Sequence, residues 1–108
     1  MLSKELLIEQ LKTFQTKEVP TESLPDGVGP LYVRSCSEAD VEWVLKDMNC
    51  GRSRMLCVTL CDTEGVLAFE RKELQIVKGF SFEILDAVWK VAAALNGIAV
   101  NPEDSGKN

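Results

Sequence analysis

Apolar side chains recur at intervals of three and four residues in the first segment of the chain, SKELLIEQLKTFQ at residues 3–15. This spacing predicts a short amphipathic helix with Ser3 as its N-cap. Its apolar stripe consists of Leu6, Leu7, Leu11 and Phe14. A helix of about three turns is only marginally stable by itself in water. We therefore expect it to pack on the body of the domain or on something else.

The next segment, residues 16–36, has the pattern of short strands. The PDGVG sequence at residues 25–29 is rich in turn formers, and Pro20 suits only an edge strand or the end of a strand. Apolar and polar side chains then alternate along LYVR at residues 31–34, as in a half-buried strand. These patterns predict a small antiparallel hairpin between about residues 17 and 35, with helices covering one face.

A second helix is predicted to begin after Ser37, which is a good N-cap. Glu38 and Asp40 fall in its first turn, where the helix dipole favours acidic side chains. An apolar stripe follows beside Trp43. Gly51 is predicted to end this helix in the left-handed conformation.

The apolar segment RMLCVTLC at residues 54–61 fits either a buried strand or a buried helix, because periodicity alone does not separate them. The turn formers at residues 62–65 follow it. A short helix is then predicted over residues 70–78, ending at Gly79.

The clearest helix in the chain is predicted over residues 82–96. Ser81 is its N-cap, and Asn96 with Gly97 ends it because these two residues adopt left-handed geometry easily. The predicted fold is mainly α (α+β): a short N-terminal helix, a small β-hairpin and a helical bundle-like body. These elements form a single domain over residues 1–100, and the polar residues 101–108 form a disordered tail.

The net charge and the lengths of the apolar runs indicate which classes of partner to expect. The net charge is −5 and no window is strongly basic, so binding to nucleic acid is not expected. No apolar run approaches the roughly 20 residues that span a bilayer, and no membrane association is expected. Charged residues occupy the N-terminal positions that a signal peptide fills with apolar ones, which indicates a cytoplasmic protein.

The chain has no histidine, so the commonest general base and the commonest transition-metal ligand are missing together. Its cysteines are Cys36, Cys50, Cys57 and Cys61, and no two of them form a C-x-x-C pair. We expect reduced thiols that pack as small apolar side chains, with no metal site and no cofactor. A cysteine without a histidine partner is a poor nucleophile, and we expect no enzymatic activity.

The order of elements resembles the tail assembly chaperones of long-tailed, lambda-like bacteriophages (siphoviruses). The matching places are LYVRSCS at residues 31–37 leading into a Ser-Glu-Ala-Asp cap, LCDTEG at residues 60–65 with Phe69 after it, and AAALNG at residues 92–97. The polar tail ending in Lys107-Asn108 also matches. Where the family often has a Thr/Ser-Asp cap after the phenylalanine, this chain has Glu70-Arg71-Lys72.

The resemblance implies that residues 54–61 close a helix and that Asp62 to Gly65 turn the chain into an extended stretch. Asp62 would form the turn, Gly65 would supply the positive φ, and Phe69 would anchor the core. Asn96 and Gly97 would likewise have a structural role at the end of the last helix.

For function, the resemblance implies a non-enzymatic chaperone in the host cell cytoplasm. Such a protein binds the phage tape measure protein, keeps it soluble, helps to recruit tail tube subunits and is absent from the mature virion. The alternative is a structural tail or head–tail joining protein that stays in the virion. A helper that coats a long partner is also expected to self-associate.

Candidate partner-binding residues are those on apolar stripes that have two possible roles. Leu6, Leu7, Leu11 and Phe14 would either complete the core or lie on a helix that detaches and contacts a partner. Trp43, beside the stripe of its helix, would either pack in the core or be an exposed anchor.

Gly106-Lys107 lies at the end of the chain, where genes of this family often have a ribosomal frameshift. Codons for Gly-Lys permit such slippage. The longer product would carry an extra domain that contacts the major tail tube protein, and the polar tail would tether the two domains.

Overall fold

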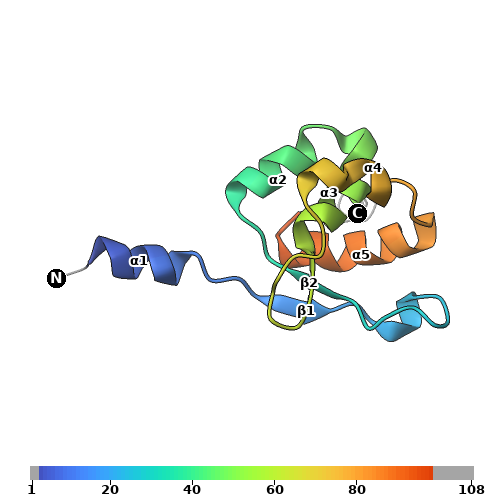
Figure 1. Ribbon diagram of the computed structural model, residues 1–108, viewed down its shortest axis with the longest axis horizontal. Coiled ribbons are helices and arrows are strands. Elements are labelled where there is room, and N and C mark those ends of the chain that lie inside the picture. Colours follow the sequence, from blue (N-terminus) through green and yellow to red (C-terminus); the bar gives the residue numbers. More distant parts are fainter. Residues whose placement is uncertain (1–2, 99–108) are drawn as a thin grey trace, which may run out of the picture.

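The structure, a computed structural model, describes residues 3–98, and these form a helical body packed on a small antiparallel sheet (Figure 1). The prediction of a mainly α (α+β) fold is confirmed. The tail predicted for residues 101–108, with Gly106-Lys107, lies outside the described residues.

The helices are α1 (Lys4–Leu11), α2 (Glu38–Leu45), α3 (Gly51–Thr59), α4 (Leu74–Val77) and α5 (Phe82–Leu95). The strands are β1 (Thr16–Glu18), β2 (Tyr32–Arg34) and β3 (Leu60–Cys61). The 3-10 turns are η1 (Thr21–Ser23), η2 (Met48–Cys50) and η3 (Arg71–Glu73).

The sheet has the order β1-β2-β3, and both strand pairs are antiparallel. The predicted hairpin is confirmed: Lys17 pairs with Val33 in the centre of β1 and β2. Val33 also pairs with Leu60, so β3 adds a third strand that the sequence analysis does not predict. Val33 is fully buried, which directs one face of the sheet toward the helices.

The core lies between α3, α5 and the sheet. Helix α3 packs against α5, α2 and α4, and α5 also covers β2. Met55 and Leu56 of α3 and Val88 and Ala92 of α5 are at most 1% exposed. Small alanines on α5 allow the two helices to approach closely.

The segment 54–61 combines the two structures that its apolar pattern allows. It is helical as far as Thr59 and then becomes strand β3. The expectation that the helix runs to residue 61 is therefore wrong for the last two residues, because they pair with β2 instead. Gly51 does not end the preceding helix either: its φ is −57°, and it opens α3. A Cβ on Gly51 would come 3.2 Å from Cε of Met48, a side-chain end that is 54% exposed.

Three serine caps predicted from the sequence are confirmed. The side-chain oxygens of Ser3, Ser37 and Ser81 accept hydrogen bonds from backbone N–H groups three residues later, at 3.2–3.4 Å. The helix predicted over residues 70–78 starts as η3 and continues as α4. Its first turn is held by Glu70, whose N–H donates to Oε1 of Glu73 at 2.8 Å.

Candidate partner-binding site

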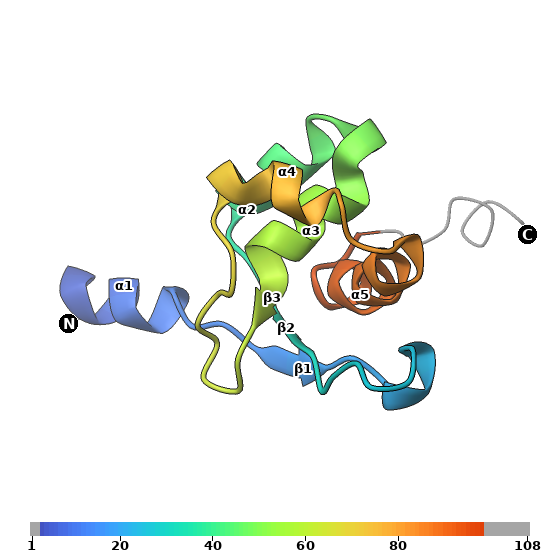
Figure 2. The ribbon, with the colours of Figure 1, turned by 45° about the vertical axis from the view of Figure 1, so that its right-hand side comes forward.

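The N-terminal arm, residues 3–14, projects from the body of the protein (Figures 1 and 2). No residue of α1 is buried. Leu6 is 53% exposed, Leu11 is 80% exposed and Phe14 is 42% exposed, while Leu7 is half-buried. The possibility that this stripe completes the core is therefore wrong, and Leu6 and Leu11 keep more than half of their side-chain surface open to a partner.

The base of the arm is held firmly. The guanidinium of Arg34 lies 4.0 Å from the ring centroid of Phe14. The same guanidinium donates from Nη1 to the carbonyl oxygen of Gly65 at 2.8 Å. The N–H of Gln15 donates to Oγ of Ser35 at 2.9 Å, and the N–H of Ser35 donates to the carbonyl of Gln15 at 2.8 Å. The arm consequently leaves the sheet in a set direction.

Trp43, the remaining candidate, belongs to α2, a helix that lies apart from the arm in both views (Figures 1 and 2). The guanidiniums of Arg54 and Arg71 lie 4.7 and 4.9 Å from its ring centroid. Arg54 Nη1 also donates to the Trp43 carbonyl at 2.6 Å, and Arg71 pairs with Asp40 at 2.6 Å. The indole packs against the core at its edge and is covered by these two arginines. The structure does not bring Trp43 together with the arm.

The turn at residues 62–65 has the structural role expected for it. Oδ1 of Asp62 accepts from the N–H groups of Glu64 and Val66 at 2.8 and 2.9 Å. Gly65 has a φ of +85°, which a side chain would strain. The chain then returns beside β3 through a bridge between Cys61 and Leu67. The segment is thus a helix end followed by a tight antiparallel return.

Two further expected structural residues hold the body together. Phe69 packs against the core, 5.7 Å from Phe80 between ring centroids. Asn96 links the end of α5 to the loop after β2: its Oδ1 accepts from the N–H of Cys36 at 2.8 Å, and its Nδ2 donates to the Ala92 carbonyl at 2.8 Å. Gly97, with a φ of +76°, ends the helix as predicted.

A groove runs between α5 and the β1–η1 segment and holds about 660 Å³. Its apolar lining comes from Pro20 on one side and from Phe82, Ala87, Val91 and Ala94 on the other. We call it the α5 groove. The sequence analysis does not predict it, since Pro20 and α5 are far apart in the chain.

Phe82 is one of the apolar residues that line the α5 groove, and the sequence analysis does not single it out. It is 65% exposed because it occupies the first position of α5, beyond the edge of the core. The guanidinium of Arg52 lies 4.9 Å from its ring centroid. An aromatic residue directly after a serine cap is the sequence signal that marks it.

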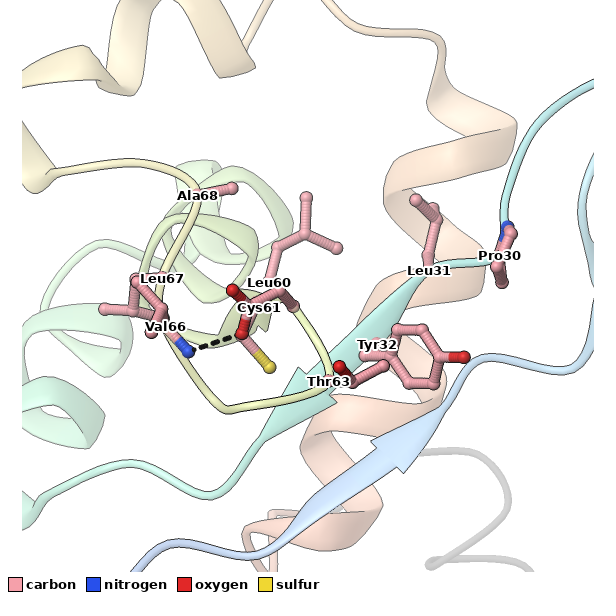
Figure 3. A pocket seen from close by; sticks show the side chains of 10 residues that line it. Pro30, Leu31, Tyr32, Leu60, Cys61, Thr63, Val66, Leu67 and Ala68 are labelled. Carbon is pink, nitrogen blue, oxygen red and sulfur yellow. Dashed lines mark hydrogen bonds between the residues drawn. The ribbon is translucent and has the colours of Figure 1, made fainter.

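A second hollow, of about 510 Å³, lies between β2 and the return loop (Figure 3). Leu31 and Tyr32 line one side, while Leu60, Val66 and Ala68 line the other. Val66 is 63% exposed. Tyr32, Cys61, Asp62 and Thr63 contribute its polar groups.

Neither a protein-family model, nor a curated protein, nor a solved structure matches this chain.

Three of the cysteine thiols, those of Cys36, Cys57 and Cys61, have pKa values above the ordinary value of a thiol. Burial is the main cause that raises the pKa of Cys36 and of Cys57 to about 11, helped by the nearby carboxylates of Asp40 and Glu73 respectively. Burial likewise raises the pKa of Cys61. Among residues 3–98 no group of three or more potential acidic or cysteine ligands could hold a metal ion. In the same range, no helix is long and apolar enough to cross a membrane.

The raised thiol pKa values predict a loss of stability at alkaline pH. An unfolded thiol ionises near pH 9.0, whereas Cys36 and Cys57 in the folded protein stay protonated up to about pH 11. Between these values the unfolded state binds fewer protons, so the free energy of unfolding falls as the pH rises. Urea unfolding across this window measures the fall. A Cys57→Ala variant should show a shallower pH dependence, and an equal slope would contradict the assignment.

Proposed function

We propose that this protein is a phage tail assembly chaperone, a non-enzymatic helper that covers the apolar helical stripes of a tape measure protein. The observation that carries the proposal is the N-terminal arm, whose Leu6 and Leu11 stay exposed while the core closes without them. An exposed stripe of this kind is typical of helix-to-helix recognition, in which apolar side chains at three- and four-residue spacing face a partner helix.

A tape measure protein would offer an apolar helical surface that matches the apolar side chains of the arm. A long helical protein that is not yet enclosed by its tube exposes apolar stripes, which aggregate unless they are covered. Many copies of a small acidic protein along one such partner would add avidity and keep the complex soluble by mutual repulsion. The net charge of −5 suits that role. In the host cytoplasm the bound copies would also help to recruit tail tube subunits.

If the gene lies in a phage tail operon, co-expression with the tape measure protein of that operon tests the proposal. We expect the wild-type chain to raise the soluble fraction of the tape measure protein and to co-purify with it. A variant with Leu6→Ser and Leu11→Ser should bind about 10–100-fold more weakly, because it loses much of the apolar area that the arm offers. Lys12→Gln on the polar face of the arm is the control and should bind normally. A tape measure protein that stays insoluble with the wild-type chain contradicts the proposal.

The alternative is a structural tail or head–tail joining protein that is retained in the virion. Mass spectrometry of purified particles separates the two functions, because a chaperone is missing from finished particles and a joining protein is present in stoichiometric amounts.

A further inference from the structure

The direction of the N-terminal arm depends on few contacts. Strand-like hydrogen bonds hold the chain to β2 only as far as Gln15, which bonds to Ser35. Within residues 3–98, every hydrogen bond of residues 3–14 joins two residues of that same segment. Residues 13–15 are neither helix nor strand, so backbone rotations there would swing the arm unless another contact held it.

Arg34 supplies this contact. Residue 34 is fixed in the sheet by its pairing with Thr16, and its guanidinium lies 4.0 Å from the ring centroid of Phe14. The ring quadrupole attracts a cation at this distance. Phe14 is the first residue of the arm beyond the last hydrogen bond to β2, so a hold on its ring sets the path of everything before it.

The return loop, residues 62–66, orients the same guanidinium. Nη1 of Arg34 donates to the carbonyl oxygen of Gly65 at 2.8 Å. The loop is itself held by Asp62, whose Oδ1 accepts hydrogen bonds from two backbone N–H groups. Gly65 also lies against the start of β1, where a Cβ on it would come 3.7 Å from Cγ2 of Thr16. One side chain therefore joins the arm to a loop that is far away in the sequence.

The packing of the body does not by itself call for an arginine at position 34. Nε of Arg34 is buried, and none of the described residues accepts a hydrogen bond from it. A buried donor without an acceptor lowers stability, whereas an unbranched apolar side chain such as methionine would leave no donor unpaired. The guanidinium is instead explained by its two outer contacts, with the ring of Phe14 and with the carbonyl of Gly65.

We propose that Arg34 is a positioning residue that latches the arm to the return loop and so sets the direction in which the arm meets its partner. Phe14 is then the anchor of the arm, whereas Leu6 and Leu11 face the partner. A held arm loses less conformational freedom on binding than a swinging one. The proposal deepens the proposed function and rests on it for the partner, but the latch itself is a property of the free chain.

Residual dipolar couplings of the free chain in solution test the latch, because they report the direction of α1 relative to α5. In the wild-type chain the couplings of both helices should fit one common alignment. Arg34→Met should reduce the couplings of α1 toward zero and leave those of α5 unchanged. Arg52→Met is the matched control, since Arg52 also lies over an aromatic ring, that of Phe82 at 4.9 Å, but on a helix of the body. A wild-type arm that tumbles independently overturns the proposal, as does an Arg34→Met arm that keeps its direction.

Substitutions of the two groups that Arg34 contacts test each half of the latch. Phe14→Tyr keeps the ring and should keep the direction of the arm, whereas Phe14→Leu should release it. Gly65→Ala strains a φ of +85° and should loosen the arm by displacing the carbonyl. Gly97→Ala applies the same kind of strain at a φ of +76° at the end of α5 and should leave the arm in place. Equal couplings for Phe14→Tyr and Phe14→Leu, or unchanged couplings for Gly65→Ala, contradict the latch.

Binding measurements separate the latch from the proposed function. Arg34→Met leaves Leu6 and Leu11 in place, yet it should bind the tape measure protein about 3–10-fold more weakly, by the cost of ordering a free arm. An affinity equal to that of the wild type overturns the role of the latch in partner binding. If the wild-type chain does not bind that protein, the proposed function fails, while the couplings of the free chain still decide whether Arg34 holds the arm.

Discussion

Replacing Leu56 with alanine is expected to lower the free energy of unfolding by about 2–5 kcal/mol, because it opens a cavity in a tightly packed core. Leu56 is 1% exposed and lies on α3, the helix that contacts α5, α2 and α4. A domain of this size has a total stability of roughly 5–15 kcal/mol, so the loss is a large fraction of the whole. Urea unfolding followed by circular dichroism measures it.

Leu11→Ala provides the matched control, since it removes the same atoms from an exposed side chain. It should change the free energy of unfolding by less than about 0.5 kcal/mol. A loss as large as that of Leu56→Ala would mean that the arm packs on the body in solution. The arm would then have no free stripe, and the proposed function would lose its support.

Replacing Asn96 with alanine is expected to cost about 1–3 kcal/mol, because it leaves the N–H of Cys36 without its acceptor in a partly buried site. The side chain also loses its bond to the Ala92 carbonyl at the end of α5. Urea unfolding gives the total effect. Hydrogen exchange gives the local one, and the amide of Cys36 should exchange much faster in the variant.

Asn49→Ala is the control for this substitution, because Asn49 is an exposed asparagine in η2. Its replacement should leave both measurements close to those of the wild-type chain. If Asn96→Ala behaved in the same way, the link between α5 and the loop after β2 would not contribute to stability.

Local chemistry predicts much of this fold. The serine caps at positions 3, 37 and 81 follow from the preference of a hydroxyl for unpaired N–H groups at a helix start. The return at Asp62 and Gly65 follows from an Asx turn and a positive φ. The hairpin follows from alternation on either side of a turn-rich loop. In the caps and the return the interacting groups are close in the sequence, and in the hairpin the strands are consecutive along the chain.

Other features depend on segments that are distant in the chain. Residues 60–61 follow a helix without a break in hydrophobicity, and they become a strand only because β2 offers an edge to pair with. Gly51 follows a helix and a short 3-10 turn, as a glycine that ends a helix does, but it opens α3, which packs against α5. Local propensity is overridden at both places by tertiary contacts.

The sequence by itself determined which side chains of the arm share a stripe, because helical spacing sets the face on which each residue lies. It did not determine whether the core covers that stripe, since periodicity carries no information about the opposing element. Only the tertiary structure decided this, by closing the core with α3, α5 and Val33 and by directing the arm outward at Arg34. The α5 groove also depends on the tertiary structure, because Pro20 and Phe82 line the same groove only when the chain is folded.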